Sequence, residues 1–185
     1  MRSIVPDSHQ PSPAARAVFL DRDGTIMRDV NYCGDPAEVE VFAFVPAALR
    51  RLRQAGFKIY IITNQSGIGR GYFTVEDYHA VEKEIARQLG EALIDGTYFC
   101  PDLPESGSPC RKPAPGMIFA AARDHSLDLS RSFMVGDKAI DAQCGRNAGV
   151  RSILVHASSG VDAAVADWHA RDLAEAAEII VRHAV

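Results

Sequence analysis

The stretch FLDRDGTIM, residues 19–27, places two carboxylates two positions apart directly after an apolar run. The run over residues 17–20 is short and continuous, which is typical of a parallel strand buried on both faces. A folding chain does not normally bring like charges together without a compensating partner. The stretch therefore predicts a first buried strand that ends at Asp21 and carries a functional pair of acids, Asp21 and Asp23.

Length and composition indicate one globular unit. The chain has 185 residues, of which 47% are hydrophobic, and its formal net charge of -4 argues against broad binding to nucleic acid or to an anionic membrane. Residues 1–15 contain three prolines and predict a flexible N-terminus before a single domain over residues 16–185. We expect a cytoplasmic protein with reduced cysteines that acts as a monomer, although the sequence leaves the oligomeric state open.

Apolar runs alternate with helical periodicity along the rest of the chain. Helices are expected from Pro46 to just before Gly56, over 74–89, 115–125 and 139–148, and finally over roughly 162–183. Further strands are expected over 58–62, 132–135 and 152–155, and in the region 93–100, which a turn at residues 95 and 96 could divide. This alternation predicts a three-layer, Rossmann-like α/β domain with a mainly parallel sheet of about five or six strands.

The intervals between the polar motifs limit what can be inserted into this fold. About forty residues separate Asp21 from Thr63, and about fifty separate Asn64 from Lys112, which is at the low end of domain sizes. Core elements already occupy part of each interval. We therefore expect no large cap domain.

Polar side chains follow several of the expected strands. Asp21, the pair Thr63 and Asn64, and Asp137 each stand where a strand ends, and parallel strands bring such ends to one edge of the sheet. Asp141 lies one helical turn beyond Asp137. Together with Asp23 these acids form a dense group of carboxylates, which would repel itself and any phosphate unless a cation lay among them, and oxygen ligands favour Mg²⁺.

These residues also supply the parts that phosphoryl transfer needs. Asp21 is placed to attack phosphorus as a nucleophile, and Asp23 is placed to protonate the leaving alkoxide and later to activate water. Lys112 and Thr63 are candidates for stabilising charge on the transferring phosphoryl group. The segment TNQSGIGRG, residues 63–71, offers amide, hydroxyl and backbone groups that can surround phosphate oxygens, while Arg111 and Lys138 add positive charge.

Four motifs in order, DRDGT, TNQSG, RKP and GDKAID, resemble those of the haloacid dehalogenase (HAD) superfamily of aspartyl phosphatases. More narrowly, FLDRDGT, TNQSGIGRG, CRKPAPGM and MVGDKAID resemble the D-glycero-D-manno-heptose-1,7-bisphosphate 7-phosphatases, from about residue 18 to residue 155. The resemblance implies Mg²⁺-dependent removal of the 7-phosphate of a heptose bisphosphate. It also implies a role in making the heptose of lipopolysaccharide or surface glycans.

The resemblance carries roles for individual residues. Mg²⁺ would be held by Asp21, the backbone carbonyl of Asp23, and Asp137. Tyr32 would contact substrate, although simple packing is the alternative for this side chain. The sequence does not decide between the α and β anomers. The substrate contacts that the resemblance implies are Asp29, Val30, Asn31, Tyr32, Asn64, Gln65, Ser66, Arg111 and Lys138, beside Thr63 and Lys112.

Other functions remain as alternatives. Histidinol-phosphate phosphatases share the nucleophile motif and the RKP segment, but they typically have aspartate where this chain has Ser66 and tend to lack the lysine at Lys138. A phospho-accepting signalling domain also places acids, a threonine and a lysine at strand ends, yet Asp23 favours turnover over a stable aspartyl-phosphate. A catalytically inactive binding protein is disfavoured by the intact acids.

The chain departs from the resemblance in its cysteine loop. The family usually binds a structural zinc through Cys-x-His and Cys-x-Cys, whereas this chain has Cys100-Pro-Asp102 and Ser108-Pro-Cys110. Only Cys100, Asp102 and Cys110 remain as candidate ligands, and closed structural zinc sites normally use four Cys or His side chains. We expect no stoichiometric zinc, with the prolines of this loop stiffening it instead.

Overall fold

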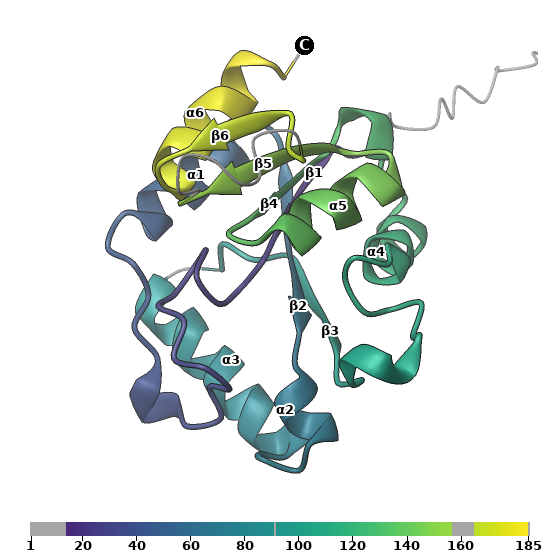
Figure 1. The fold of residues 1–185 in the computed structure, drawn as a ribbon. Coiled ribbons are helices and arrows are strands. Elements are labelled where there is room, and N and C mark those ends of the chain that lie inside the picture. The colour runs from purple at the N-terminus through teal and green to yellow at the C-terminus, as the bar shows by residue number, and fades with distance from the viewer. Residues whose placement is uncertain (1–13, 91, 157–164, 185) are drawn as a thin grey trace, which may run out of the picture.

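The fold is built on a six-stranded parallel sheet (Figure 1). The computed structural model describes residues 14–90, 92–156 and 165–184. Within these ranges the strand order is β3-β2-β1-β4-β5-β6, and every neighbouring pair is parallel. The strands are β1 (Ala17–Leu20), β2 (Lys58–Asn64), β3 (Gly96–Cys100), β4 (Phe133–Gly136), β5 (Arg151–Val155) and β6 (Trp168–Ala170).

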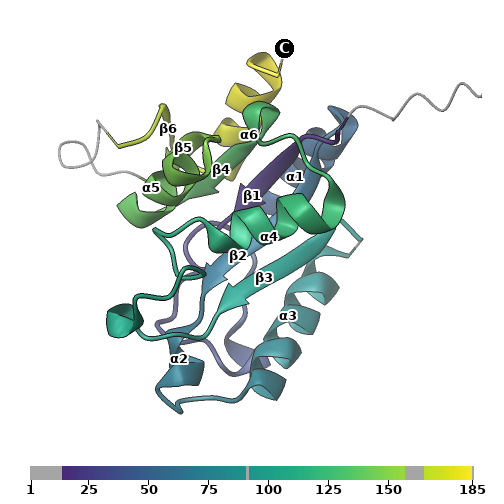
Figure 2. The ribbon, with the colours of Figure 1, turned by 90° about the vertical axis from the view of Figure 1, so that its right-hand side faces the viewer.

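Helices cover both faces of this sheet, which gives the three layers expected from the sequence (Figures 1 and 2). One face carries α1 (Val45–Gln54), α3 (Val75–Leu89) and α6 (Leu173–Arg182). The other carries α4 (Gly116–His125) and α5 (Ala139–Ala148). The shorter helical segments are α2 (Ser66–Gly69) and the 3-10 turns Pro36–Glu38, Pro104–Ser106 and Leu129–Arg131.

The strand order reverses beside β1. The chain runs from β1 to β2 and β3 in one direction, then crosses back to place β4 on the opposite side of β1. Right-handed crossovers in opposite directions put the connecting helices on opposite faces, as observed for α1 and α3 against α4 and α5. Ligands of open α/β sheets bind at such a switch point, here beyond the ends of β1 and β4.

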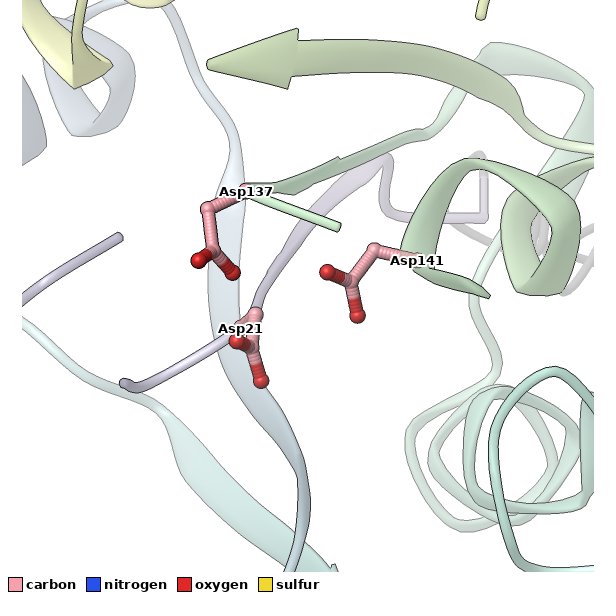
Figure 3. A group of neighbouring side chains, drawn as sticks. All are labelled: Asp21, Asp137 and Asp141. Carbon is pink, nitrogen blue, oxygen red and sulfur yellow. The ribbon is translucent and has the colours of Figure 1, made fainter. Parts of the chain in front are cut away.

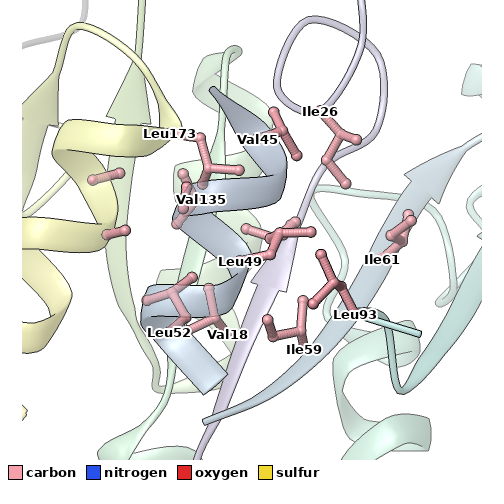
Figure 4. Close-up of a cluster of buried hydrophobic side chains, with 14 of the residues drawn as sticks. Val18, Ile26, Val45, Leu49, Leu52, Ile59, Ile61, Leu93, Val135 and Leu173 are labelled. Atoms are coloured by element: carbon pink, nitrogen blue, oxygen red, sulfur yellow. The ribbon is translucent and has the colours of Figure 1, made fainter. Parts of the chain in front are cut away.

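Side chains of β1 pack into both halves of the core. Val18 and Leu20 lie in the cluster beneath α1, α3 and α6, whereas Phe19 lies in the cluster beneath α4 and α5. This follows from the alternation of side chains along a strand. On α1, Leu49 and Leu52 are fully buried against the first cluster, as Figure 4 shows. The sequence prediction of a strand buried on both faces is confirmed.

The ends of α3 follow from local signals in the sequence. The Thr74 hydroxyl accepts a hydrogen bond from the Asp77 amide at 3.1 Å, and the Asp77 carboxylate accepts one from the Thr74 amide at 2.8 Å. This reciprocal pair is a capping box. At the other end Gly90 adopts φ of 75°, the left-handed conformation that ends many helices. The predicted helix over 74–89 is confirmed.

Each of the two intervals in which a cap could have been inserted contains one long loop connection, and both connections, residues 21–44 and 101–115, lie inside the described ranges. The first, between β1 and α1, contains one 3-10 turn and isolated bridges such as Met27 to Val41. The second, between β3 and α4, contains the turn Pro104–Ser106. The expectation of no large cap domain is confirmed. None of the helices in the described ranges has the length and apolar character needed to cross a membrane.

The last expected helix, over roughly 162–183, is wrong in its first half. Residues 165–167 form a turn and bend, Trp168–Ala170 forms β6 beside β5, and α6 begins only at Leu173. The Asp167 carboxylate accepts a hydrogen bond from the Ser152 amide at 2.7 Å, which ties this segment to the sheet edge. Pairing with β5 therefore overrides the helical tendency of the local sequence. Residues 162–164 lie outside the described residues.

Two further expectations concern chain segments at the sheet margins. In the region 93–100 the strand starts at Gly96, because the Asp95 carboxylate accepts hydrogen bonds from the Ile59 amide at 2.9 Å and from Arg53 at 2.8 Å. The expected strand is thus shortened to its second part: residues 92–94 are not in a strand, and the chain bends at Asp95 rather than turning between two strands. The expected flexible segment 1–15 falls, except for residues 14 and 15, outside the described residues.

Replacing Asp172 by alanine tests where α6 begins. The Asp172 carboxylate accepts a hydrogen bond from the Glu175 amide at 2.9 Å, so its loss should lower the free energy of unfolding by about 1 kcal/mol in urea titrations. If a helix ran through this position from residue 162, the same change would instead raise stability by roughly 0.5 kcal/mol, because alanine is the better interior residue. Glu178→Ala, at an exposed position of α6, is the control and should change little.

Candidate active site

Three carboxylates meet where β1 and β4 end. Asp21 follows β1, Asp137 follows β4, and Asp141 lies in the first turn of α5. Each offers an oxygen within 4.8 Å of the others, and Figure 3 shows the three side chains turned toward a common space. The expectation that strand ends bring Asp21 and Asp137 together is confirmed. Asp141 belongs to this group, as expected, whereas the Asp23 side chain is not part of the cluster formed by the described residues.

A buried lysine bridges two of these acids. Lys112 is only 3% exposed, and its ammonium nitrogen lies 2.5 Å from Asp21 Oδ1 and 2.6 Å from Asp141 Oδ1. Burial by itself would lower the pKa of Lys112, but Asp141 and Asp21 raise it above its ordinary value, so the side chain stays charged. The site therefore contains a fixed cation directly beside Asp21.

The backbone of Lys112 is held in place by the side chain of Asn64. The Asn64 side chain accepts a hydrogen bond from the Lys112 amide at 3.0 Å and donates one to the Lys112 carbonyl at 3.1 Å. This two-point contact joins the end of β2 to the segment that precedes α4. The side-chain amide of Asn64, which the resemblance assigned to substrate, is thus paired with the backbone that carries Lys112.

Asp137 has the least satisfied carboxylate of the group. Its Oδ1 atom is buried without a hydrogen-bond partner. Burial, and after it the charge of Asp21, raises the pKa of Asp137 to about 7. A side chain at Gly24 could not coexist with this acid, because a Cβ atom there would lie 2.3 Å from Asp137 Oδ2, and φ of Gly24 is +85°. The DRDGT turn thus requires glycine at its fourth position.

Asp141 has two roles in the structure. Its Oδ2 atom accepts a hydrogen bond from the Lys138 amide at 3.0 Å, which caps the start of α5. Its Oδ1 atom forms the ion pair with Lys112. A helix-capping acid and a member of the charged cluster are therefore the same residue.

The Asp23 side chain joins a second, separate network. Its carboxylate accepts hydrogen bonds from Arg22 and, at 3.0 Å, from the amide of Gln65. Gln65 is 4% exposed, and it also donates to the Thr63 hydroxyl at 2.8 Å. Because that hydroxyl accepts from Gln65, its own proton remains available to donate to another oxygen. The structure thus buries Gln65 among protein groups and leaves Thr63 able to act as a donor.

A loop after β1 forms the open side of the site. The Lys138 ammonium donates to Asp29 Oδ2 at 2.9 Å, and Asp29 Oδ1 accepts from the Asn31 amide at 3.0 Å. Asn31 and Tyr32 adopt φ of 56° and 66°, values that are uncommon outside glycine. A cavity of about 190 Å³ lies here. Its lining includes Asp23, Asp29, Asn31, Tyr32, Ser66 and Lys138.

Two expected substrate contacts lie elsewhere. Val30 is partly buried and packs against the core cluster under α1. Arg111 donates a hydrogen bond to the Asp102 carbonyl at 2.8 Å and lines a different cavity of about 430 Å³, together with Lys112 and Ile140. Tyr32 is 41% exposed and makes an edge-to-face contact with Tyr72, with ring centroids 5.0 Å apart.

In the loop that contains Cys100, Asp102 and Cys110, the Cys100 thiol makes hydrogen bonds to other side chains. All four cysteines of the chain are free. The buried Cys100 thiol lies 3.6 Å from Asp102 Oδ2 and 4.0 Å from Ser108 Oγ, whereas Cys110 is exposed. In the described part of the chain, Cys100, Asp102 and Cys110 do not form a cluster of converging ligand atoms.

Comparison with known proteins identifies the family. Residues 109–179 match the family model for HAD-hydrolase-like proteins. A D-glycero-D-manno-heptose-1,7-bisphosphate 7-phosphatase from Thermosynechococcus vestitus is 42% identical over 90% of this chain and 96% of its own length. A D-glycero-alpha-D-manno-heptose-1,7-bisphosphate 7-phosphatase from Burkholderia mallei is 41% identical over 91% and 89%. The chain belongs to the heptose-1,7-bisphosphate 7-phosphatase family.

A solved structure of this family supports the same assignment. The D,D-heptose 1,7-bisphosphate phosphatase from B. bronchiseptica, complexed with magnesium and phosphate, superposes with a TM-score of 0.81 and 31% identity. The match covers 91% of this chain and 99% of the other. The expected fold class and family are thereby confirmed.

Glu82 belongs to the buried network around Arg22 and Asp23, but the sequence patterns did not identify it. Glu82, on α3, lies 3.6 Å from the Arg22 guanidinium, behind the DRDGT turn. In the sequence Glu82 is one of several acids on an amphipathic helix, so no local signal separates it from solvent-facing neighbours. The one available signal was Arg22, which lies between Asp21 and Asp23 in the sequence and whose positive charge needs an acidic partner if it is buried.

Replacing Asp137 by asparagine should stabilise the protein in EDTA at pH 8. The folded state holds the proton of Asp137 up to pH about 7, against 3.8 for the unperturbed group, so this carboxylate destabilises the fold progressively as pH rises through that window. The gain in melting temperature should therefore be clear at pH 8 and small near pH 4. Asp124→Asn is the control: the pKa of Asp124 is lowered by Arg123, so its replacement should give no gain. A gain that is equal at both pH values would contradict this account.

Proposed function

We propose that this protein is a Mg²⁺-dependent phosphatase that removes the 7-phosphate of D-glycero-D-manno-heptose 1,7-bisphosphate through an aspartyl-phosphate on Asp21. The observation that carries the proposal is the buried contact of Lys112 with Asp21, inside a group of three converging carboxylates, in a chain of this family. The relatives named above supply the substrate class.

The carboxylate group fits a divalent cation. Asp21, Asp137 and Asp141 bring three acids together around one buried ammonium, that of Lys112, while the half-exposed Lys138 lies 3.8 Å from Asp137 Oδ2 and Asp137 Oδ1 stays buried without a hydrogen-bond partner. Mg²⁺ prefers such oxygen ligands. Asp21 and Asp137, with the backbone carbonyl of Asp23, would hold the ion, and Asp141 is a further candidate. When bound, the ion would neutralise charge on the phosphate oxygens.

The protein's own groups account for the proton and phosphoryl transfers. A carboxylate oxygen of Asp21 attacks phosphorus as the bond from phosphorus to the sugar oxygen breaks, and Asp23 gives its proton to that oxygen. Water then attacks the aspartyl-phosphate and transfers a proton to Asp23, which releases inorganic phosphate and restores both acids. The Lys112 ammonium and the Thr63 hydroxyl donate hydrogen bonds to the transferring phosphoryl group.

Substrate recognition is assigned to the rim of the site. The cavity lined by Asp29, Asn31, Tyr32, Ser66 and Lys138 would contain the sugar next to Asp23. Arg111 lines the other cavity, together with Lys112, and would add positive charge for the second phosphate. Asn64 and Gln65 would support this site through Lys112 and Asp23.

We also infer the setting in which the enzyme works. Residues 16–185 would form a single domain that acts as a cytoplasmic monomer on a small sugar phosphate, without nucleic acid or membrane as partner. The product would serve heptose synthesis for lipopolysaccharide or surface glycan. Size-exclusion chromatography with light scattering tests the monomer, and a mass near twice 20.1 kDa would contradict it.

Replacing Asp21 by asparagine should abolish phosphate release from heptose 1,7-bisphosphate, because the amide cannot form the acyl phosphate. Removal of Mg²⁺ by EDTA should do the same reversibly. Phosphate release is measured with purified wild-type and variant protein, and Asp35→Asn, at an exposed 3-10 cap that lines neither of the two cavities described above, is the matched control. Wild-type turnover by the Asp21 variant would refute the aspartyl-phosphate route.

Substrate choice is tested by a parallel assay of both heptose bisphosphate anomers and histidinol phosphate. The proposal expects the higher kcat/KM for one heptose anomer. A preference for histidinol phosphate would reassign the enzyme to that alternative.

Purified protein should contain no stoichiometric zinc. The expected reason is that Ser108 and Asp102 stand at two of the four positions that closed zinc sites fill with Cys or His. Elemental analysis of protein purified without chelators measures this directly. About one zinc per chain, lost on replacing Cys100 or Cys110 by serine, would contradict the prediction.

A further inference from the structure

A fully buried arginine grips the Asp23 carboxylate. The Arg22 side chain is 0% exposed, and its Nε and Nη2 atoms donate to Asp23 Oδ2 and Oδ1, each at 3.1 Å. Two parallel hydrogen bonds between a guanidinium and a carboxylate fix the orientation of both planar groups. Although Arg22 also neighbours Asp21 in sequence, its observed pairing is with Asp23.

Gln65 completes the grip from the other side. Its amide donates to Asp23 Oδ2 at 3.0 Å, and its carbonyl accepts from Arg22 Nη2 at 3.2 Å. A carboxylate has about four acceptor positions, of which Arg22 and Gln65 use three. Oδ2 has both of its positions filled, so Oδ1 is the oxygen left with room for a proton.

A second acid balances the arginine charge. Glu82 approaches Arg22 Nη1 at 3.6 Å, and its side chain is 17% exposed. The ring centroid of Tyr78, also on α3, lies 5.6 Å from the Arg22 guanidinium carbon. One guanidinium thus lies between two carboxylates, and a buried charge is tolerated only with such partners. Arg22 does not line the cavity beside Asp23, so it has no direct route to substrate.

We infer that Arg22 is a positioning residue for proton transfer: it holds the Asp23 carboxylate so that Oδ1 exchanges the proton, while Glu82 supplies the counter-charge that keeps the guanidinium buried. The inference rests on the proposed function in that Asp23 is the acid/base. Its action is confined to the proton steps and leaves Asp21, Lys112 and the carboxylate cluster as they are.

The test uses the need of the leaving group for a proton. An alkoxide leaves poorly unless it is protonated, whereas p-nitrophenolate is a stable anion that leaves without help. We compare kcat/KM, which reports the first phosphoryl transfer, for heptose 1,7-bisphosphate and for p-nitrophenyl phosphate. In Asp23→Asn, kcat/KM should fall far more for heptose 1,7-bisphosphate than for p-nitrophenyl phosphate. This difference measures the effect of removing the acid completely.

Arg22→Met should show the same asymmetry in weaker form. Misplacing an acid that remains present should cost about 10- to 100-fold on the heptose substrate and little on the aryl substrate. Arg22→Met alone leaves Asp23 and Glu82 without the cation between them. The double variant Arg22→Met/Glu82→Gln removes one of these two charges as well, and thermal unfolding checks that it folds. Arg22→Lys keeps the charge without the fork and should recover only part of the loss.

The outcomes separate the inference from the function beneath it. A merely structural role would lower the amount of folded enzyme and reduce both activities equally. Equal losses in the folded double variant, with asymmetry in Asp23→Asn, would overturn the inference alone. No asymmetry in Asp23→Asn would overturn the acid role of Asp23 and the inference together. Asymmetry in both variants supports the inference.

Discussion

The contact of the Lys112 ammonium with Asp21 and Asp141 is the interaction on which the site depends. Three carboxylates reach the same point because β1 and β4 are adjacent and parallel, and α5 starts directly after β4. One buried ammonium offsets two of these charges and leaves Asp137 with a raised pKa and an unpartnered oxygen. The fold therefore assembles a site that is short of positive charge, which is the condition that a divalent cation would relieve.

That arrangement depends on contacts between distant parts of the chain. Lys112 belongs to a loop rather than to a strand, and Asn64 fixes its main chain from the end of β2. Gln65, the next residue, reaches Asp23 and Thr63. Two neighbouring amides thus brace two different catalytic groups. The TNQSG motif therefore holds Lys112 and Asp23 in place, in addition to the phosphate contact that the proposed function gives it.

Local patterns predicted what local forces decide. The apolar run before Asp21 indicated a strand buried on both faces, and Thr74 with Gly90 marked the ends of α3. The segment before α6 was misread because its pairing with β5 depends on Asp167 and Ser152, which are 15 residues apart. The same distinction between local and tertiary determinants applies to the residues of the site. Strand ends placed Asp21 and Asp137, but which way the Asn64 and Gln65 amides face is a tertiary matter that no spacing reveals.

The chemical and recognition parts of the site differ in how they are held. Asp21, Lys112 and Thr63 are buried on strand ends or clamped to them, so a changed side chain there disturbs packed charges. The loop that contains Asn31 and Tyr32 is exposed, and it holds two non-glycine residues at positive φ, a conformation that costs roughly 1–3 kcal/mol at each position. The Asp29 contacts with Lys138 and the Asn31 amide help to maintain that shape. Under the proposed function, substitutions in this loop would change which phosphate ester is accepted while the buried cluster stays as it is.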